Sequence, residues 1–162
     1  MNQAPTARET LKLFKLLINM KKSIFLAALV LISAGCFAQK ANVSKARGLA
    51  DAETPDYAGA RAAIAEALQN EETKEQANTW YVAGFIGYKE FETANLNRQI
   101  GRNIDFDQWG AAVYESVGYW DKAYELAMIP TYDKKGRAKY DTRTPKNILP
   151  KLQEYFMYQP MI

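Results

Sequence analysis

The sequence predicts an all-α fold for residues 39–162 of this 162-residue chain. Three observations lead to this prediction. Apolar residues recur three and four positions apart, which places them on one face of a helix. Alanine, the strongest helix former, fills much of residues 57–69. No segment alternates apolar and polar residues over the length of a strand, so no sheet is expected.

Five helical segments account for this domain. The first covers about 41–52, and the second covers 57–69 with Asp56 as its N-cap. Thr73 is expected to cap the third helix together with Gln76, its capping-box partner three residues on. That helix runs to about residue 94, and the polar residues 95–103 are expected to form a loop or a frayed helix end.

The fourth helix is expected to begin at Asp105 or Asp107. Its apolar positions follow spacings of four and three, and this stripe is expected to face the core: Val113, Val117, Trp120, Tyr124 and Ala127. The stripe keeps its phase across Gly118, so we predict one long helix that stops at Pro130.

A loop over residues 132–144 leads to a fifth helix that begins near Pro145. Pro150 is either tolerated early in this helix or delays its start. The helix continues through five apolar residues, Ile148, Leu149, Leu152, Tyr155 and Phe156.

The residues before the domain follow the order of a secretory signal peptide. Lys21 and Lys22 are followed by nine unbroken apolar residues, 24–32, and then by small residues up to Ala38. We assign residues 20–38 as a signal cleaved after Ala38; a core helix or a single-pass anchor is the alternative. The uncharged stretch, residues 23–38, has 16 residues, fewer than the roughly 20 that span a bilayer. No membrane span is therefore expected in the mature form.

The start and the processing of the chain each leave an alternative. Residues 1–19 are interpreted as an upstream extension before a natural start at Met20, or else as part of one long n-region. The single cysteine, Cys36, ends a sequence that is similar to a bacterial lipobox, so a lipid anchor there is the alternative to cleavage after Ala38. Ser33 stands where a lipobox prefers an aliphatic residue, which favours the Ala38 cut. Both routes place the protein in a bacterial periplasm or outer envelope.

Charge and composition exclude several classes of function. Residues 1–38 hold five of the 21 basic and one of the 18 acidic residues, which leaves the mature chain with a net charge of −1. This balance gives no basis for binding nucleic acid. The chain has no histidine and, after cleavage, no cysteine, which excludes His-based triads and thiolate zinc sites. We expect a protein that is not an enzyme and that binds neither a cofactor nor a metal.

Small and aromatic residues recur along the predicted helices. One set combines Tyr57, Ala60, Ile64 and Ala67, and a second combines Trp120, Ala123 and Ala127. Trp80, Ala83 and Gly84 lie on the helix between them, where Gly84 and Gly87 are interpreted as helix-packing residues. This pattern resembles the tetratricopeptide repeat over roughly residues 41–130. A non-repeating helical bundle is the alternative.

The resemblance implies a short solenoid of antiparallel helix pairs in which Gly48 packs against Ala60 and Ala123 belongs to a second-unit helix. The array is expected to be incomplete after Ile162, because the last apolar helix has no later helix to cover it. The implied function is a protein-interaction scaffold whose partner is another protein or peptide. Four aromatic residues are candidate partner contacts: Trp109, Tyr119, Trp120 and Tyr124. The alternative is a glycan-binding or lipid-anchored envelope component that uses exposed Trp and Tyr rings.

Overall fold

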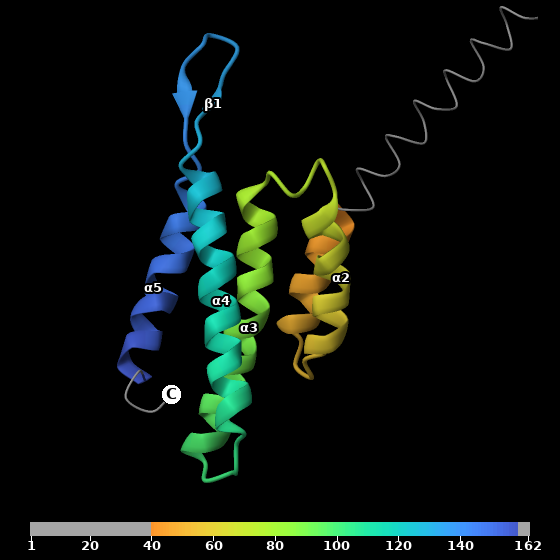
Figure 1. Ribbon diagram of the computed structural model, residues 1–162, viewed down its shortest axis with the longest axis vertical. Helices are drawn as coiled ribbons and strands as arrows, with labels where there is room; N and C mark the ends of the chain where they lie inside the picture. Colours follow the sequence, from red (N-terminus) through yellow and green to blue (C-terminus); the bar gives the residue numbers. More distant parts are fainter. Residues whose placement is uncertain (1–39, 159–162) are drawn as a thin grey trace, which may run out of the picture. The chain divides into compact units, whose positions relative to one another are not determined.

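The computed structural model describes residues 40–158 (Figure 1). This part of the chain is all-α, with helices packed in pairs. A helix over residues 40–50 is followed by α2 (Tyr57–Gln69), α3 (Ala77–Gln99), α4 (Phe106–Ala127) and α5 (Arg143–Tyr158). The assignments of the start site, the signal peptide and the role of Cys36 lie outside the described residues and stay predictions.

Two of the expected helix starts are confirmed. The Asp56 side chain accepts a hydrogen bond from the Gly59 backbone N–H at 2.8 Å, and α2 has the predicted bounds. Asp105 caps α4 by accepting from the N–H groups of Asp107 and Gln108. These acceptors satisfy backbone donors that have no partner inside the helix.

The expectations for both ends of α3 were wrong. Thr73 is fully buried, and its hydroxyl donates to the Ala67 carbonyl at 2.6 Å instead of capping α3. The helix begins at Ala77 after a turn, and it continues to Gln99 instead of ending near residue 94. Gly101, with a φ of 77°, then allows the chain to leave the helix.

A small hairpin between α4 and α5 corrects the expectation that there is no sheet. β1 (Thr131–Tyr132) and β2 (Ala138–Lys139) pair antiparallel, with Thr131 opposite Lys139. The Asp133 carboxylate accepts from the backbone N–H groups of Lys135 and Arg137, and Gly136 adopts a φ of 73°. Strands of two residues are too short to produce an alternating pattern, so turn chemistry is the only local signal for this hairpin.

The helix α4 is continuous through Gly118, as predicted, but its core face differs from the expected stripe. The buried positions are Trp109, Ala112, Ser116, Trp120, Ala123 and Ala127. Val117 and Tyr124 are exposed, and Val113 is only half-buried. Ala112, Ser116 and Trp120 of α4 lie against the glycines of α3, where the two helices approach closely, while Val117 and Tyr124 lie on the outside.

This close approach depends on Gly84 and Gly87 of α3. A Cβ atom at Gly84 would lie 2.5 Å from Cδ1 of Trp120 and 2.8 Å from the Ser116 carbonyl oxygen. A Cβ atom at Gly87 would lie 2.6 Å from the Ala112 carbonyl oxygen. Both glycines are therefore packing residues, as the sequence predicted, and α3 and α4 run side by side along most of their length (Figure 1).

The residues assigned to repeat packing mostly lie in the core. Ala60, Ile64, Ala67, Ala83 and Ala123 are buried, and Tyr57 and Trp80 are half-buried. Gly48 is the exception, because it is exposed and a Cβ built on it would meet nothing within 4 Å. The expected contact between Gly48 and Ala60 is therefore wrong. The buried small residues of this first helix are Ala46 and Ala50.

Replacing Gly84 by alanine tests the α3–α4 seam. We expect Gly84→Ala to lower the free energy of unfolding by about 2 kcal/mol or more, because the new methyl group overpacks a rigid interface. Gly118→Ala is the matched control, since Gly118 lies in α4 and a methyl group added there would meet nothing within 4 Å. That change should raise stability by about 0.5–1 kcal/mol through helix propensity. Urea denaturation followed by circular dichroism measures the free energy of unfolding of both variants. Equal effects of the two substitutions would contradict the close packing of α3 against α4 at Gly84.

Candidate functional site

The candidate partner-binding aromatics do not form one surface. Trp109 and Trp120 are each 1% exposed, so both are core residues, and neither presents the open aromatic ring that the sequence analysis expected at a partner contact. The Trp120 indole N–H donates to the Tyr81 carbonyl at 3.1 Å, and the Trp109 ring stacks on Phe91 with centroids 5.5 Å apart. Of the four candidates, Tyr119 is half-buried and Tyr124 is 45% exposed.

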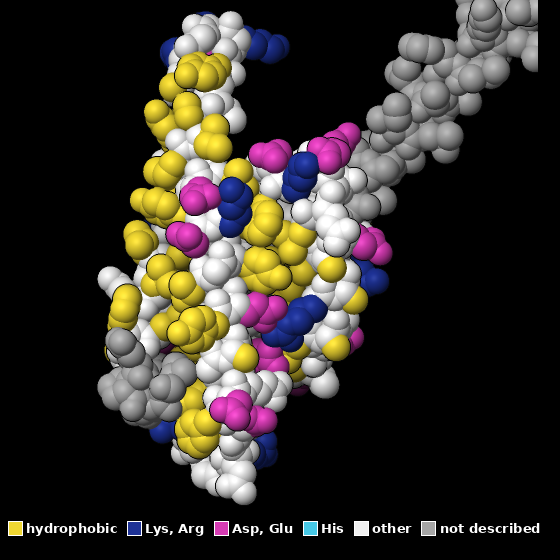
Figure 2. Space-filling view, viewed as in Figure 1, with side chains coloured by type: hydrophobic (Ala, Val, Ile, Leu, Met, Phe, Trp, Pro, Cys, Tyr) yellow, Lys and Arg dark blue, Asp and Glu magenta, His cyan; other side chains and the backbone are white. Residues whose placement is uncertain are grey.

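Tyr124 lies instead on an apolar groove between α4 and α5. The groove has a volume of about 240 Å³, and its lining is mostly apolar: Val117, Trp120, Tyr124, Ile148, Leu149 and Leu152. The exposed carboxylate of Asp121 also lines it. Figure 2 shows hydrophobic side chains gathered over α4 and α5 on this face of the molecule. We call this feature the α4–α5 groove.

Exposed apolar residues continue the groove along both helices. On α4, Tyr114, Val117 and Tyr124 are exposed at spacings of three and seven, which places them on one face. On α5, Leu149 and Phe156 are exposed seven residues apart. The stripe that the sequence revealed on α4 therefore exists, but part of it faces outward and forms a surface instead of a core seam.

Buried contacts fix α5 against α3 and α4, and so fix the shape of the groove. Ile148 and Tyr155 of α5 are buried, and the Tyr155 ring stacks on Trp120 with centroids 5.9 Å apart. The Tyr88 hydroxyl of α3 donates to Glu154 at 2.6 Å, and Lys151 Nζ lies 4.3 Å from the centre of the Tyr88 ring. Burial raises the pKa of both Tyr88 and Tyr155, and hydrogen bonding to Glu154 raises that of Tyr88 further.

An ionic cluster joins three helices. Arg61 of α2 donates through Nη2 to Glu90 of α3 at 2.6 Å and to Glu115 of α4 at 2.5 Å. These hydrogen bonds, that to Glu115 above all, raise the pKa of the Arg61 guanidinium, so it stays charged. The cluster links residues 54 positions apart, and no local sequence pattern could have identified it.

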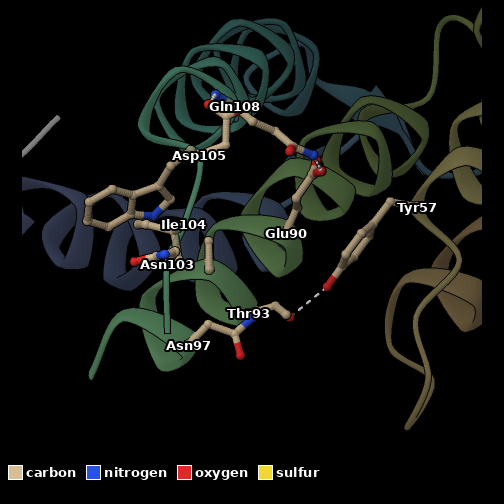
Figure 3. Close-up of a pocket in the computed structure, with 10 residues that line it drawn as sticks. Tyr57, Glu90, Thr93, Asn97, Asn103, Ile104, Asp105 and Gln108 are labelled. Atoms are coloured by element: carbon tan, nitrogen blue, oxygen red, sulfur yellow. Dashed lines mark hydrogen bonds between the residues drawn. The ribbon is translucent and has the colours of Figure 1, made fainter. Parts of the chain in front are cut away.

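A second hollow, which we call the α3–α4 pocket, lies where the last turns of α3 meet the start of α4. It has a volume of about 250 Å³, and both polar and apolar side chains line it. The side chains of Glu90, Thr93, Asn97, Asp105 and Gln108 surround it, and Tyr57 of α2 approaches from one side (Figure 3). No local sequence pattern predicts this pocket, because its residues come from three separate segments.

The described part of the chain contains neither a candidate metal site nor a candidate membrane span. Within residues 40–158, no group of three Cys, His, Asp or Glu side chains could hold a metal ion. In the same residues, no helix is both long enough and apolar enough to cross a bilayer. Comparison of the chain with protein-family models, with curated proteins and with solved structures gave no match.

Replacing Arg61 by methionine tests the ionic cluster. We expect Arg61→Met to lower the free energy of unfolding by about 1–2 kcal/mol, because two partly buried carboxylates lose their charged donor. Adding Glu115→Gln should restore part of the loss by removing repulsion between Glu90 and Glu115. Lys122→Met, which breaks an exposed pair with Glu125, should change stability by less than about 0.5 kcal/mol. A loss for Arg61→Met no larger than for Lys122→Met would contradict the role of the cluster.

The raised tyrosine pKa values predict alkaline destabilisation. Above about pH 10, Tyr88 and Tyr155 ionise in the unfolded chain but stay neutral in the folded one. Stability is therefore fully present below that pH and falls as the pH rises, by up to about 1.4 kcal/mol per pH unit for each tyrosine. Urea midpoints measured between about pH 9 and 11 should show a shallower decline for Tyr155→Phe. Tyr132→Phe, at an exposed hairpin position, should leave the slope unchanged.

Proposed function

We propose that the protein is an exported, non-catalytic helical scaffold that binds an amphipathic α-helix of another protein in the α4–α5 groove. Export rests on the signal sequence assigned to residues 20–38. The resemblance to tetratricopeptide repeats supports a scaffold role. The observation that carries the proposal is the exposed apolar groove between two helices whose positions are fixed by buried contacts.

The way in which α4 packs inside the domain supports a helical occupant. α4 lies along α3, and its Glu115 side chain reaches across to α2. Glu115 forms an ion pair with Arg61 of α2, and the Tyr119 ring lies 6.1 Å from the ring of Trp80 on α3. The junction between α4 and α5 is a similar two-helix surface, and among the described residues no helix covers it. A helix laid along α5 would repeat this packing mode.

Charge favours an occupant with a basic edge. Asp121 lines the groove and makes no ion pair within residues 40–158. A Lys or Arg on the edge of a docked helix would pair with this carboxylate, while apolar side chains of that helix cover Tyr124, Leu149 and Leu152. Recognition of an amphipathic helix by an apolar groove uses anchors at spacings of three, four and seven.

The alternative of glycan stacking on exposed tryptophan rings has less support. Trp109 and Trp120 are buried in the core. Trp80 is half-buried, and its indole N–H donates to the Lys74 carbonyl at 2.6 Å. Sugar rings stack on open aromatic faces, so a glycan would have to stack on exposed tyrosine rings instead of tryptophan rings.

A display selection tests the proposal. A library of amphipathic helical peptides is selected against the full chain, and the dissociation constants of the selected peptides are measured for variants. Leu149→Lys, which places a charge in the groove, should weaken their binding at least about tenfold, or roughly 1.4 kcal/mol. The control is Leu96→Lys, since Leu96 of α3 is as open as Leu149, at 60% and 54% exposed.

The selected peptides also report on charge. Binders should be enriched in Lys or Arg on one edge, and Asp121→Lys should reverse that preference. If no peptide is enriched, or if the binders tolerate Leu149→Lys as well as Leu96→Lys, the groove is not a helix-binding site. Concentration-dependent dimerisation of the full chain that Leu149→Lys abolishes would replace the proposal with self-association.

A further inference from the structure

We infer that the α3–α4 pocket binds a neutral polyhydroxylated ligand of about one sugar ring, as a free monosaccharide or as the terminal unit of a glycan. This inference is independent of the helix-binding groove, because none of the pocket-lining residues lines the groove. It also differs from stacking on exposed tryptophans, because it relies on hydrogen bonding in a recess.

The size of the pocket sets the size of the ligand. Its volume of about 250 Å³ is below the range of roughly 300–1,000 Å³ that is usual for sites enclosing drug-sized molecules. Ala94 and Ile104 contribute apolar surface to the lining. One small ring can therefore present its C–H face to these side chains while its hydroxyl groups meet the polar ones.

The charges around the pocket disfavour an ionic ligand. Its lining contains the carboxylates of Glu90 and Asp105 and no Lys or Arg, so an anion would be repelled. Each of these two carboxylates already accepts hydrogen bonds from other groups of the protein. Glu90 accepts from Arg61 at 2.6 Å and from Gln108 at 2.7 Å, and Asp105 caps the start of α4. A cation would have to compete with these existing interactions.

The remaining polar groups offer both donors and acceptors. The Asn97 oxygen accepts from Arg102 at 3.1 Å, which leaves the amide N–H groups of Asn97 to donate. Gln108 donates to Glu90 through its nitrogen, which leaves its oxygen to accept. The hydroxyl of Thr93 is hydrogen-bonded to that of Tyr57 at 2.7 Å and retains acceptor capacity.

A sugar hydroxyl matches this mixed set better than an amine or an acid does. Each hydroxyl donates one hydrogen bond and accepts others, so neighbouring hydroxyls can satisfy amide donors and carboxylate acceptors together. An ammonium group is a donor only and would leave the Asn97 amide without an acceptor. Figure 3 shows these side chains, from α2, α3, the following loop and α4, arranged around one hollow.

Saturation-transfer difference NMR on the full chain tests the inference. The probes are D-glucose, D-galactose, D-mannose and N-acetylglucosamine, each also as its methyl glycoside, with putrescine and methyl phosphate as ionic comparisons. Binding of a free sugar but not of its methyl glycoside identifies a monosaccharide site, and binding of both identifies a glycan end. At least one sugar should show saturation transfer, and neither ionic probe should.

Two variants tie the signal to the pocket. Asn97→Leu removes an amide donor, and Ala94→Phe fills the recess; each should weaken sugar binding roughly tenfold, the effect of about 1.4 kcal/mol. Asn78→Leu changes an exposed amide near the other end of α3 and should have no effect. Melting curves by circular dichroism establish that each variant is folded. The inference fails if no sugar binds, if putrescine binds in their place, or if both pocket variants bind sugar as the wild type does.

Discussion

The close approach of α3 to α4 at Gly84 and Gly87 is the constraint on which the rest of the structure depends. Atoms of Trp120, Ser116 and Ala112 occupy the space where side chains at these two positions would lie. Because α3 carries no side chain there, the Trp120 indole can reach the Tyr81 carbonyl. The same indole then forms the surface on which Tyr155 of α5 stacks. The seam between two helices therefore determines where the third one packs.

The same constraint creates the exposed groove. Ala112, Ser116 and Trp120 of α4 occupy the space beside the two glycines of α3, and Val117 and Tyr124 lie on the outer side of the helix. Packing of α5 through Ile148 and Tyr155 then covers part of that side and leaves Leu149 beside it. An apolar surface of this kind is unusual on an isolated domain unless it serves an interaction. The groove is thus a direct consequence of glycine packing elsewhere in the fold.

Local sequence signals predicted the helices well but not the faces that they bury. The bounds of α2 and its Asp56 cap followed from propensity and capping, which act over a few residues. The predicted core face of α4 was partly wrong. The spacing of Val117 and Tyr124 places them on one face of the helix, but it does not determine whether that face meets the core or the solvent. Which side is buried depends on Gly84 and Gly87, residues of another helix. The Arg61 cluster and the α3–α4 pocket were missed for the same reason, since both assemble residues from separate segments.

The groove combines a fixed floor with an open rim, and this difference bears on how a helix would bind. Trp120 and Ile148 form the floor and are already packed in the core, so no ordering of their side chains opposes binding. Tyr124 and Leu149 on the rim are exposed and lose rotamer freedom when they are covered. Affinity should therefore come mainly from anchors that reach the floor, as at interface hot spots in general. Rim contacts and the Asp121 carboxylate would contribute more to the choice and orientation of the partner than to its binding strength.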